Sequence, residues 1–149
     1  MALTSIAAAV ILAVVIACGE SEPKHPSEVC RSDAAGGQTQ NAGSLPPGGP
    51  PSFPYIFQGQ FEVDGKPGPA GATMFARIGA AKSPSISTGA GTYRNIIIGP
   101  LTTDDVDAVV EIFLGDPEQS TVKADQTFKF TTVGVPTTYD CDISFPRLP

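Results

Sequence analysis

The chain lacks most of the residues from which catalytic and metal-binding sites are built. Its 149 residues include no Trp, one His and three Cys, and only 16% of them are charged. It contains no G-x-S-x-G, H-E-x-x-H, C-x-x-C or phosphate-loop motif. The single histidine, His25, lies in a stretch rich in Pro and Gly, so a catalytic pair elsewhere would have to do without His. These absences indicate a protein that is not an enzyme and needs no cofactor.

Positive charge is scarce as well. The chain has 9 Lys and Arg residues against 15 Asp and Glu residues, which gives a net charge of −6 and a pI near 4.5. Such a balance argues against nucleic acid as a partner and against electrostatic attraction to anionic lipids. Gly and Pro are abundant instead, with 16 and 15 residues. Because both residues interrupt helix interiors, their number disfavours a helical bundle.

The longest apolar run is too short to cross a membrane. Residues 6–17 read IAAAVILAVVIA. As a helix these residues cover about 18 Å, whereas the hydrocarbon core of a bilayer is about 30 Å thick. Their number fits the hydrophobic region of a signal peptide, which has about 7–15 residues. We therefore expect residues 1–17 to be a signal peptide. Residues 1–5 contain no Lys or Arg, where a signal peptide carries positive charge, so either the true start lies upstream or export is weaker than usual. An uncleaved signal anchor is the remaining alternative.

The end of this run resembles the lipobox of bacterial lipoproteins. Val15-Ile16-Ala17-Cys18 has an aliphatic residue at −3, a small residue at −1 and then the cysteine. The resemblance implies that Cys18 is acylated with fatty acids such as palmitate and becomes the mature N-terminus. It further implies a protein that is exported and anchored on the outer face of a cell-envelope membrane, with lipid as its first partner. An ordinary cysteine after a signal peptide is the alternative.

Residues 18–54 have the composition of a linker. The 36 residues after Cys18 include seven Pro and six Gly and follow no apolar period of 2 or 3.6 residues. A segment that cannot bury an apolar face is expected to be disordered. The run LPPGGPP at residues 45–51 favours an extended polyproline conformation. We expect this linker to be a spacer that holds the following domain away from the lipid surface.

Residues 55–149 carry the pattern of a β-domain. Apolar and polar residues alternate from Tyr55 to Val63, and Asp64-Gly65 then marks a tight turn. Similar short runs recur at spacings near ten residues, which is typical of an antiparallel sandwich. The sequence predicts six or seven strands, at residues 55–63, 73–78, 92–98, 106–114, 119–123, 127–133 and 138–145.

Two of these assignments concern segments with more than one interpretation. Residues 103–114 can also form a helix, capped by Asp104 and Asp105, but their β-branched residues and alternation favour a strand with Val110, Ile112 and Leu114 inward. The last two predicted strands flank Gly134-Val135-Pro136, which predicts a hairpin.

Several motifs of this domain resemble those of carboxypeptidase-regulatory-like domains, which are transthyretin-type sandwiches. The matching segments read GQFEVDGKPGPAGA at 59–72, GTYRNIIIGP at 91–100, VEIFLGD at 110–116 and YDCDI at 139–143. The resemblance implies an Ig-like, transthyretin-like fold and a structural or binding role without catalytic residues. The related hydroxyisourate hydrolases need His and Arg in their site, and the single His of this chain lies outside the domain. Within the motifs, we expect Tyr93 to be a buried aromatic residue with a polar end.

Acidic groups and two cysteines are the remaining candidates for a site. The acidic groups lie at 104–107, 116–118 and 140–142, and they either bind Ca²⁺ or are solvated loops. Their spacing matches no EF-hand, so we assign no metal site. Once Cys18 is acylated, Cys30 and Cys141 remain, and an exported location permits a disulfide between them. A small buried core residue is the other interpretation of Cys141.

Two functions are compatible with these features. The first is a non-enzymatic, lipid-anchored surface protein that displays one β-sandwich in a structural, adhesive or scaffolding role. The second is a lipoprotein that binds a small ligand or a glycan. The absence of Trp and the 7% aromatic content disfavour a sugar-stacking platform.

Overall fold

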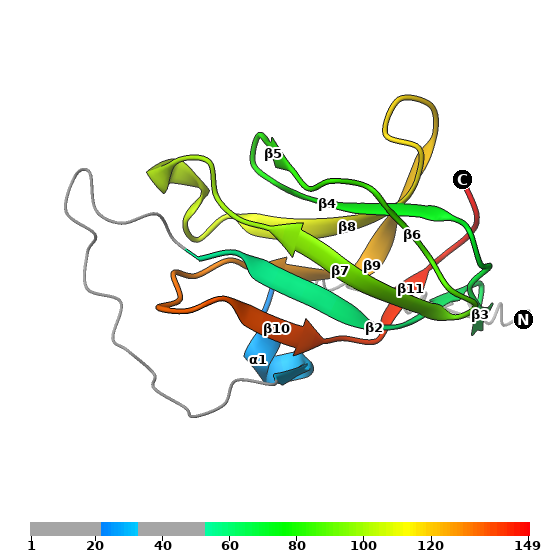
Figure 1. Cartoon of the computed structure of the whole chain (residues 1–149), viewed down its shortest axis with the longest axis horizontal. Coiled ribbons are helices and arrows are strands. Elements are labelled where there is room, and N and C mark those ends of the chain that lie inside the picture. The colour runs from blue at the N-terminus through cyan, green and yellow to red at the C-terminus, as the bar shows by residue number, and fades with distance from the viewer. Residues whose placement is uncertain (1–21, 33–52) are drawn as a thin grey trace, which may run out of the picture.

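The computed structural model describes residues 22–32 and 53–149. Two β-sheets lie face to face in this part of the chain, with one short helix packed beside them (Figure 1). The two helical segments found here have three and four residues, far fewer than a membrane crossing requires. In chain order the elements are α1 (Pro26–Val29), β1 (Arg31–Ser32), β2 (Tyr55–Val63), β3 (Lys66–Pro67), β4 (Thr73–Ile78), β5 (Ala81–Lys82), β6 (Ile86–Ser87), β7 (Thr92–Ile98), the 3₁₀ turn η1 (Thr103–Asp105), β8 (Val109–Gly115), β9 (Thr121–Lys129), β10 (Thr137–Asp140) and β11 (Ile143–Phe145).

The first sheet is organised around β2. Along one edge, β2 pairs in parallel first with β10 and then with β11. Along its other edge it pairs antiparallel with β7 and β3. The outermost strand, β1, pairs antiparallel with β10. The second sheet has the order β5-β4-β8-β9, with β6 also paired to β4, and all of its pairs are antiparallel.

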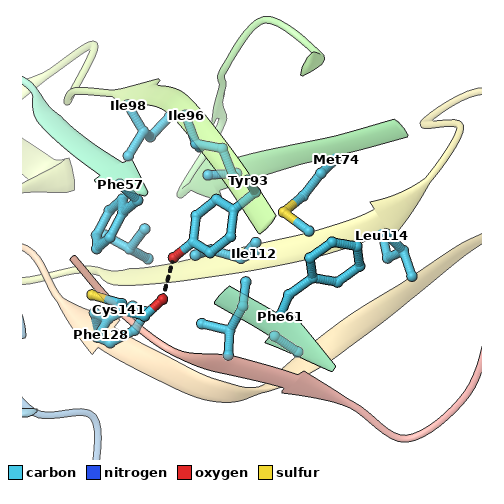
Figure 2. Packing of buried hydrophobic residues seen from close by; sticks show 14 of the residues in the cluster. Phe57, Phe61, Met74, Tyr93, Ile96, Ile98, Ile112, Leu114, Phe128 and Cys141 are labelled. Atoms are coloured by element: carbon cyan, nitrogen blue, oxygen red, sulfur yellow. Dashed lines mark hydrogen bonds between the residues drawn. The ribbon is translucent and has the colours of Figure 1, made fainter. Parts of the chain in front are cut away.

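The core fills the space between the sheets (Figure 2). Alternate residues of each long strand point inward, because successive side chains of a strand lie on opposite faces. From β2 these are Tyr55, Phe57, Phe61 and Val63; β4 adds Met74, Ala76 and Ile78; β8 adds Val110, Ile112 and Leu114. Burying each large apolar side chain contributes about 1.5–3 kcal/mol, so this alternation is the main source of stability.

The predicted β-sandwich is confirmed, and so are several strands. The bounds of β2, β4 and β7 agree with the prediction, and the alternation selects the correct inward face in β4 and β8. The turn after β2 has positive φ at both Asp64 (52°) and Gly65 (67°), as a two-residue hairpin turn requires. The helical alternative for residues 103–114 is wrong beyond the single turn η1. Strand β8 begins at Val109, three residues later than predicted.

The C-terminal part of the prediction needs correction. Residues 121–129 form one strand, β9, in place of two short strands at 119–123 and 127–133. Gly134–Pro136 is not the turn of a hairpin, because β9 pairs with β8 in one sheet and β10 pairs with β2 in the other. The predicted strand 138–145 is interrupted at Cys141 and Asp142, which separates β10 from β11. Both segments run parallel to β2, so the sandwich is not purely antiparallel.

The expectation of a disordered linker over residues 18–54 is wrong for residues 22–32. This segment forms α1 and β1, and Pro26 is buried. The backbone of Lys24 forms a bridge to Phe128 of β9, where the Lys24 C=O accepts the Lys129 N–H at 2.8 Å. The rest of that linker and the predicted signal peptide fall at residues 1–21 and 33–52, outside the described residues.

One glycine makes the division of the last strand possible. Gly59 has φ +146°, next to a register shift in the β2–β7 pairing, and a Cβ at this position would overlap the carbonyl oxygen of Cys141. We predict that Gly59→Ala lowers the free energy of unfolding by about 2 kcal/mol or more, since backbone has to move. Gly71→Ala is the control, because Gly71 has φ +79° but no neighbour within 4 Å of an added Cβ. Urea unfolding measures both, and equal losses would show that the approach of Cys141 is not the cause.

Candidate functional site

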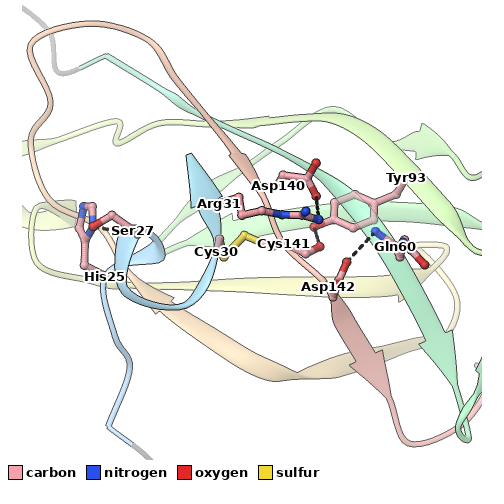
Figure 3. Close-up of a disulfide and its surroundings, with 9 residues drawn as sticks. All are labelled: His25, Ser27, Cys30, Arg31, Gln60, Tyr93, Asp140, Cys141 and Asp142. Carbon is pink, nitrogen blue, oxygen red and sulfur yellow. Dashed lines mark hydrogen bonds and ion pairs between the residues drawn. A yellow bond between two sulfur atoms is a disulfide. The ribbon is translucent and has the colours of Figure 1, made fainter. Parts of the chain in front are cut away.

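A disulfide joins the N-terminal segment to the sandwich (Figure 3). Cys30, directly after α1, and Cys141, between β10 and β11, have sulfur atoms 2.07 Å apart and Cα atoms 4.7 Å apart. The two residues are separated by 111 positions in the sequence. Cys141 is also buried in the core, so the two interpretations of this residue are compatible.

The backbone of Cys141 is held as firmly as its side chain. Its N–H donates to the Gln58 C=O at 2.7 Å, and its C=O accepts the Tyr93 hydroxyl at 2.8 Å. The prediction that Tyr93 is a buried aromatic residue with a polar end is therefore confirmed. Burial raises the pKa of Tyr93 above its usual value, and the negative charges of Asp140 and Asp142 raise it further. Tyr93 is thus a neutral hydrogen-bond donor at any physiological pH.

His25 attaches the same segment to the start of β2. Its Nε2 lies 2.9 Å from the Tyr55 hydroxyl, and its Nδ1 accepts the Ser27 N–H at 3.2 Å. Because Nδ1 accepts, the proton of the neutral ring belongs on Nε2, which donates to Tyr55. The Tyr55 hydroxyl in turn donates to the Thr131 C=O and accepts the Thr131 N–H, each at 2.9 Å. The network therefore links the N-terminal segment, the first sheet and the segment that follows β9.

Burial controls the protonation of this network. Desolvation lowers the pKa of His25 below its ordinary value, and Glu28 opposes the shift. Desolvation also disfavours the charged form of tyrosine, so it raises the pKa of Tyr55 and of Tyr139. The ring of Tyr139 lies against the imidazole of His25. Both tyrosines therefore stay neutral, and the group that can change charge near neutral pH is His25.

Most of the acidic groups that are candidates for Ca²⁺ binding are engaged with the protein itself. In the part of the chain that the structure describes, three or more His, Cys, Asp or Glu side chains do not gather where they could hold a metal ion. The carboxylates accept backbone N–H groups or face cations. Asp105 accepts Leu101 N and Thr102 N; Asp107 lies 3.2 Å from Lys129 Nζ; Asp116 accepts Glu118 N; Asp140 lies 3.9 Å from Arg31; and Asp142 accepts Gln60 N.

A cleft beside the C-terminal residues is the candidate location for a small ligand. Its volume is about 520 Å³, and its walls combine proline and aliphatic side chains with the charged residues Asp64, Lys66 and Arg147. Tyr55, Tyr93 and Tyr139 are buried in the core, so none of these three rings offers a face on which a sugar could stack.

Sequence reasoning missed the part that His25 plays. The residue lies among Pro, Ser and Glu, which is typical of a linker, and its partner Tyr55 is 30 positions away. No local period in the spacing of apolar residues predicts a contact of this kind. Cys18, the predicted lipid-bearing residue, lies outside the described residues.

Comparison of the chain with protein-family models, curated proteins and solved structures found no match. The assignment to a class therefore ends at an all-β sandwich with a disulfide-linked N-terminal segment.

The position of His25 generates a prediction about pH. Because the native pKa is lowered, the unfolded chain binds more protons than the folded protein as the pH falls below about 6.5. The stabilisation is complete above the unfolded pKa and is lost as the pH falls toward the native pKa. His25→Gln should lack this loss, so the difference in urea-unfolding free energy between wild type and variant should shrink from pH 7.5 to pH 5. A difference that is constant over this range would contradict the prediction.

The disulfide generates a second prediction. Its loop spans 111 positions, and closing so long a loop in the unfolded chain removes entropy worth at most about 4.7 kcal/mol. The double variant Cys30→Ser, Cys141→Ser should lose about 2–4 kcal/mol of unfolding free energy. Wild-type protein treated with a thiol reductant should shift toward the same denaturant midpoint. A midpoint that neither change alters would show that the disulfide does not constrain the unfolded state.

Proposed function

We propose that the chain is a non-enzymatic, lipid-anchored surface protein that displays one β-sandwich domain in a structural or adhesive role. The observation that carries this proposal is the segment Val15-Ile16-Ala17-Cys18 at the end of a 12-residue apolar run. In this proposal Cys18 bears the acyl chains, residues 1–17 are removed, and the domain is exported to the outer face of a membrane. Two or three acyl chains give stable attachment, which one chain does not.

The disulfide supports the exported location. Disulfides persist in oxidising compartments and are rare where cytosolic thiols keep cysteines reduced. Cys30, which is partly buried, is joined to Cys141, which is buried in the core between β10 and β11. The finer fold assignment, a carboxypeptidase-regulatory-like domain of transthyretin type, remains part of this proposal and rests on the motifs of the sequence.

An apolar end of the sandwich supports the adhesive role. Tyr55 pairs with both Ile98 and Thr137, so the segments before β2, after β7 and before β10 emerge at the same end. Each presents a large exposed apolar residue: Phe53 is 42% exposed, Leu101 72% and Val135 63%. Exposed apolar residues on loops at one end of a domain are available for contact with a protein partner.

The lipid anchor is tested with a labelled fatty acid. We predict that wild-type protein incorporates the label, whereas Cys18→Ser does not, because the thioether cannot form. The control is the double variant Cys30→Ser, Cys141→Ser, which loses the other two cysteines and should still be labelled. Incorporation of label into Cys18→Ser would overturn the anchor, and so would its absence from the control.

A further inference from the structure

The distance between the lipid anchor and the domain follows from where the chain first joins the fold. If the segment 18–54 were a free spacer, the first fixed residue after Cys18 would be Tyr55, 37 positions along the chain. Among the described residues of the N-terminal segment, the first backbone contact with the sandwich is made at Lys24, six positions after Cys18. An extended chain spans at most about 3.3–3.6 Å per residue. The upper limit on the spacer therefore falls from about 130 Å to about 20 Å.

Four separate contacts hold this point of attachment. The Lys24 C=O accepts the Lys129 N–H, and His25 binds the Tyr55 hydroxyl at 2.9 Å. Arg31 and Ser32 of β1 pair with Asp140 and Tyr139 of β10. The disulfide between Cys30 and Cys141 adds a covalent link that thermal motion does not open.

The second half of the expected spacer has both of its ends on the domain. It begins after Ser32, which is paired with β10, and it ends before Phe53, which precedes β2. Strands β10 and β2 are neighbours in the same sheet. Residues 33–52 therefore connect two points of one domain, and their length has no influence on the distance between the domain and Cys18.

We propose that the surface around the emerging N-terminal segment lies against the lipid headgroups of the membrane that holds the acyl chains. This inference rests on the proposed acylation of Cys18. The surface, which we call the anchor face, consists of Glu22, Lys24, Val29, Asp125 and Thr127 around a cleft of about 250 Å³. Val29 is 56% exposed there.

Charge does not bring the anchor face to the membrane. Glu22 and Asp125 carry negative charges against the single positive charge of Lys24. A surface with this balance gains nothing from anionic lipid. The short connection from Cys18 is what holds the domain at the surface, and the lipid headgroups meet whichever residues surround Lys24.

The test places one insert at two positions. Twelve Gly and Ser residues that include a protease site are inserted after Ser21 in one variant and after Gly43 in the other, and both variants and the parent carry Ser85→Cys with a donor dye. The lipidated proteins are reconstituted into vesicles of phosphatidylcholine and phosphatidylglycerol that contain acceptor-labelled lipid.

We expect the insert after Ser21 to lower energy transfer about twofold, since a flexible coil of this length adds about 20 Å. The insert after Gly43 should leave the transfer at the parent value. Equal reductions of energy transfer by both inserts would overturn the proposal and would show that the whole segment 18–54 is a free spacer.

Cutting the same inserts gives an independent readout. We expect cleavage after Ser21 to release the domain from the vesicles, whereas cleavage after Gly43 leaves it bound through the disulfide and β1. Release of the domain by both cuts would overturn the proposal. The proposed function fails in a different way: without acylation of Cys18, the uncut parent would carry no fatty-acid label and would not join the vesicles.

Discussion

The fold depends on the way in which Cys141 is held where the last strand divides. Its N–H and C=O bind Gln58 and Tyr93, its sulfur is joined to Cys30, and Gly59 leaves room for its carbonyl group. These contacts come from three parts of the chain, which are the N-terminal segment, β2 and β7. Because β10 ends just before this residue and β11 begins soon after it, the joint fixes where the C-terminal chain changes its partner residues along β2. A buried carbonyl without a hydrogen-bond partner costs about 1–3 kcal/mol. The hydrogen bond from the Tyr93 hydroxyl is therefore needed to stabilise the backbone of Cys141 in this position.

Strand β2 connects the position of Cys141 to the rest of the first sheet. Its nine residues pair with β10 and β11 along one edge and with β7 and β3 along the other. At Tyr55 the same strand carries the hydroxyl that binds His25 and Thr131. The N-terminal segment and the first sheet therefore share three points of attachment, which are the disulfide, the pairing of β1 with β10 and the hydrogen bond from His25. The parallel pairs need long connections, which are slow to close during folding.

The sequence predicts the strands well where the information is local and fails where it is not. Alternation in residues 55–63 and 73–78 gives the correct bounds and inward faces, because side-chain period is a local property. Asp125 and Gln126 resemble a break in an apolar pattern, yet Gln126 binds Ser144 of β11 and β9 continues through it. The partner of β10 and the docking of His25 depend on contacts across 30 or more positions. No pattern within residues 22–32 distinguishes them from a linker. The pairing of Cys30 with Cys141 could be proposed only because few cysteines remain once Cys18 is assigned.

The N-terminal segment has few interactions of its own, so its position depends on the compartment. A helix of four residues is not stable alone, since isolated helices below about 12 residues are marginal in water. A two-residue strand and one histidine add little to it. The disulfide makes the attachment permanent, and it persists only where thiols are oxidised. Under the proposed acylation of Cys18, export then has two linked consequences. It brings the chain to its membrane, and it completes the disulfide that keeps residues 22–32 docked on the sandwich. The backbone contact at Lys24 in this docked segment then lies within about 20 Å of the lipid-bearing residue.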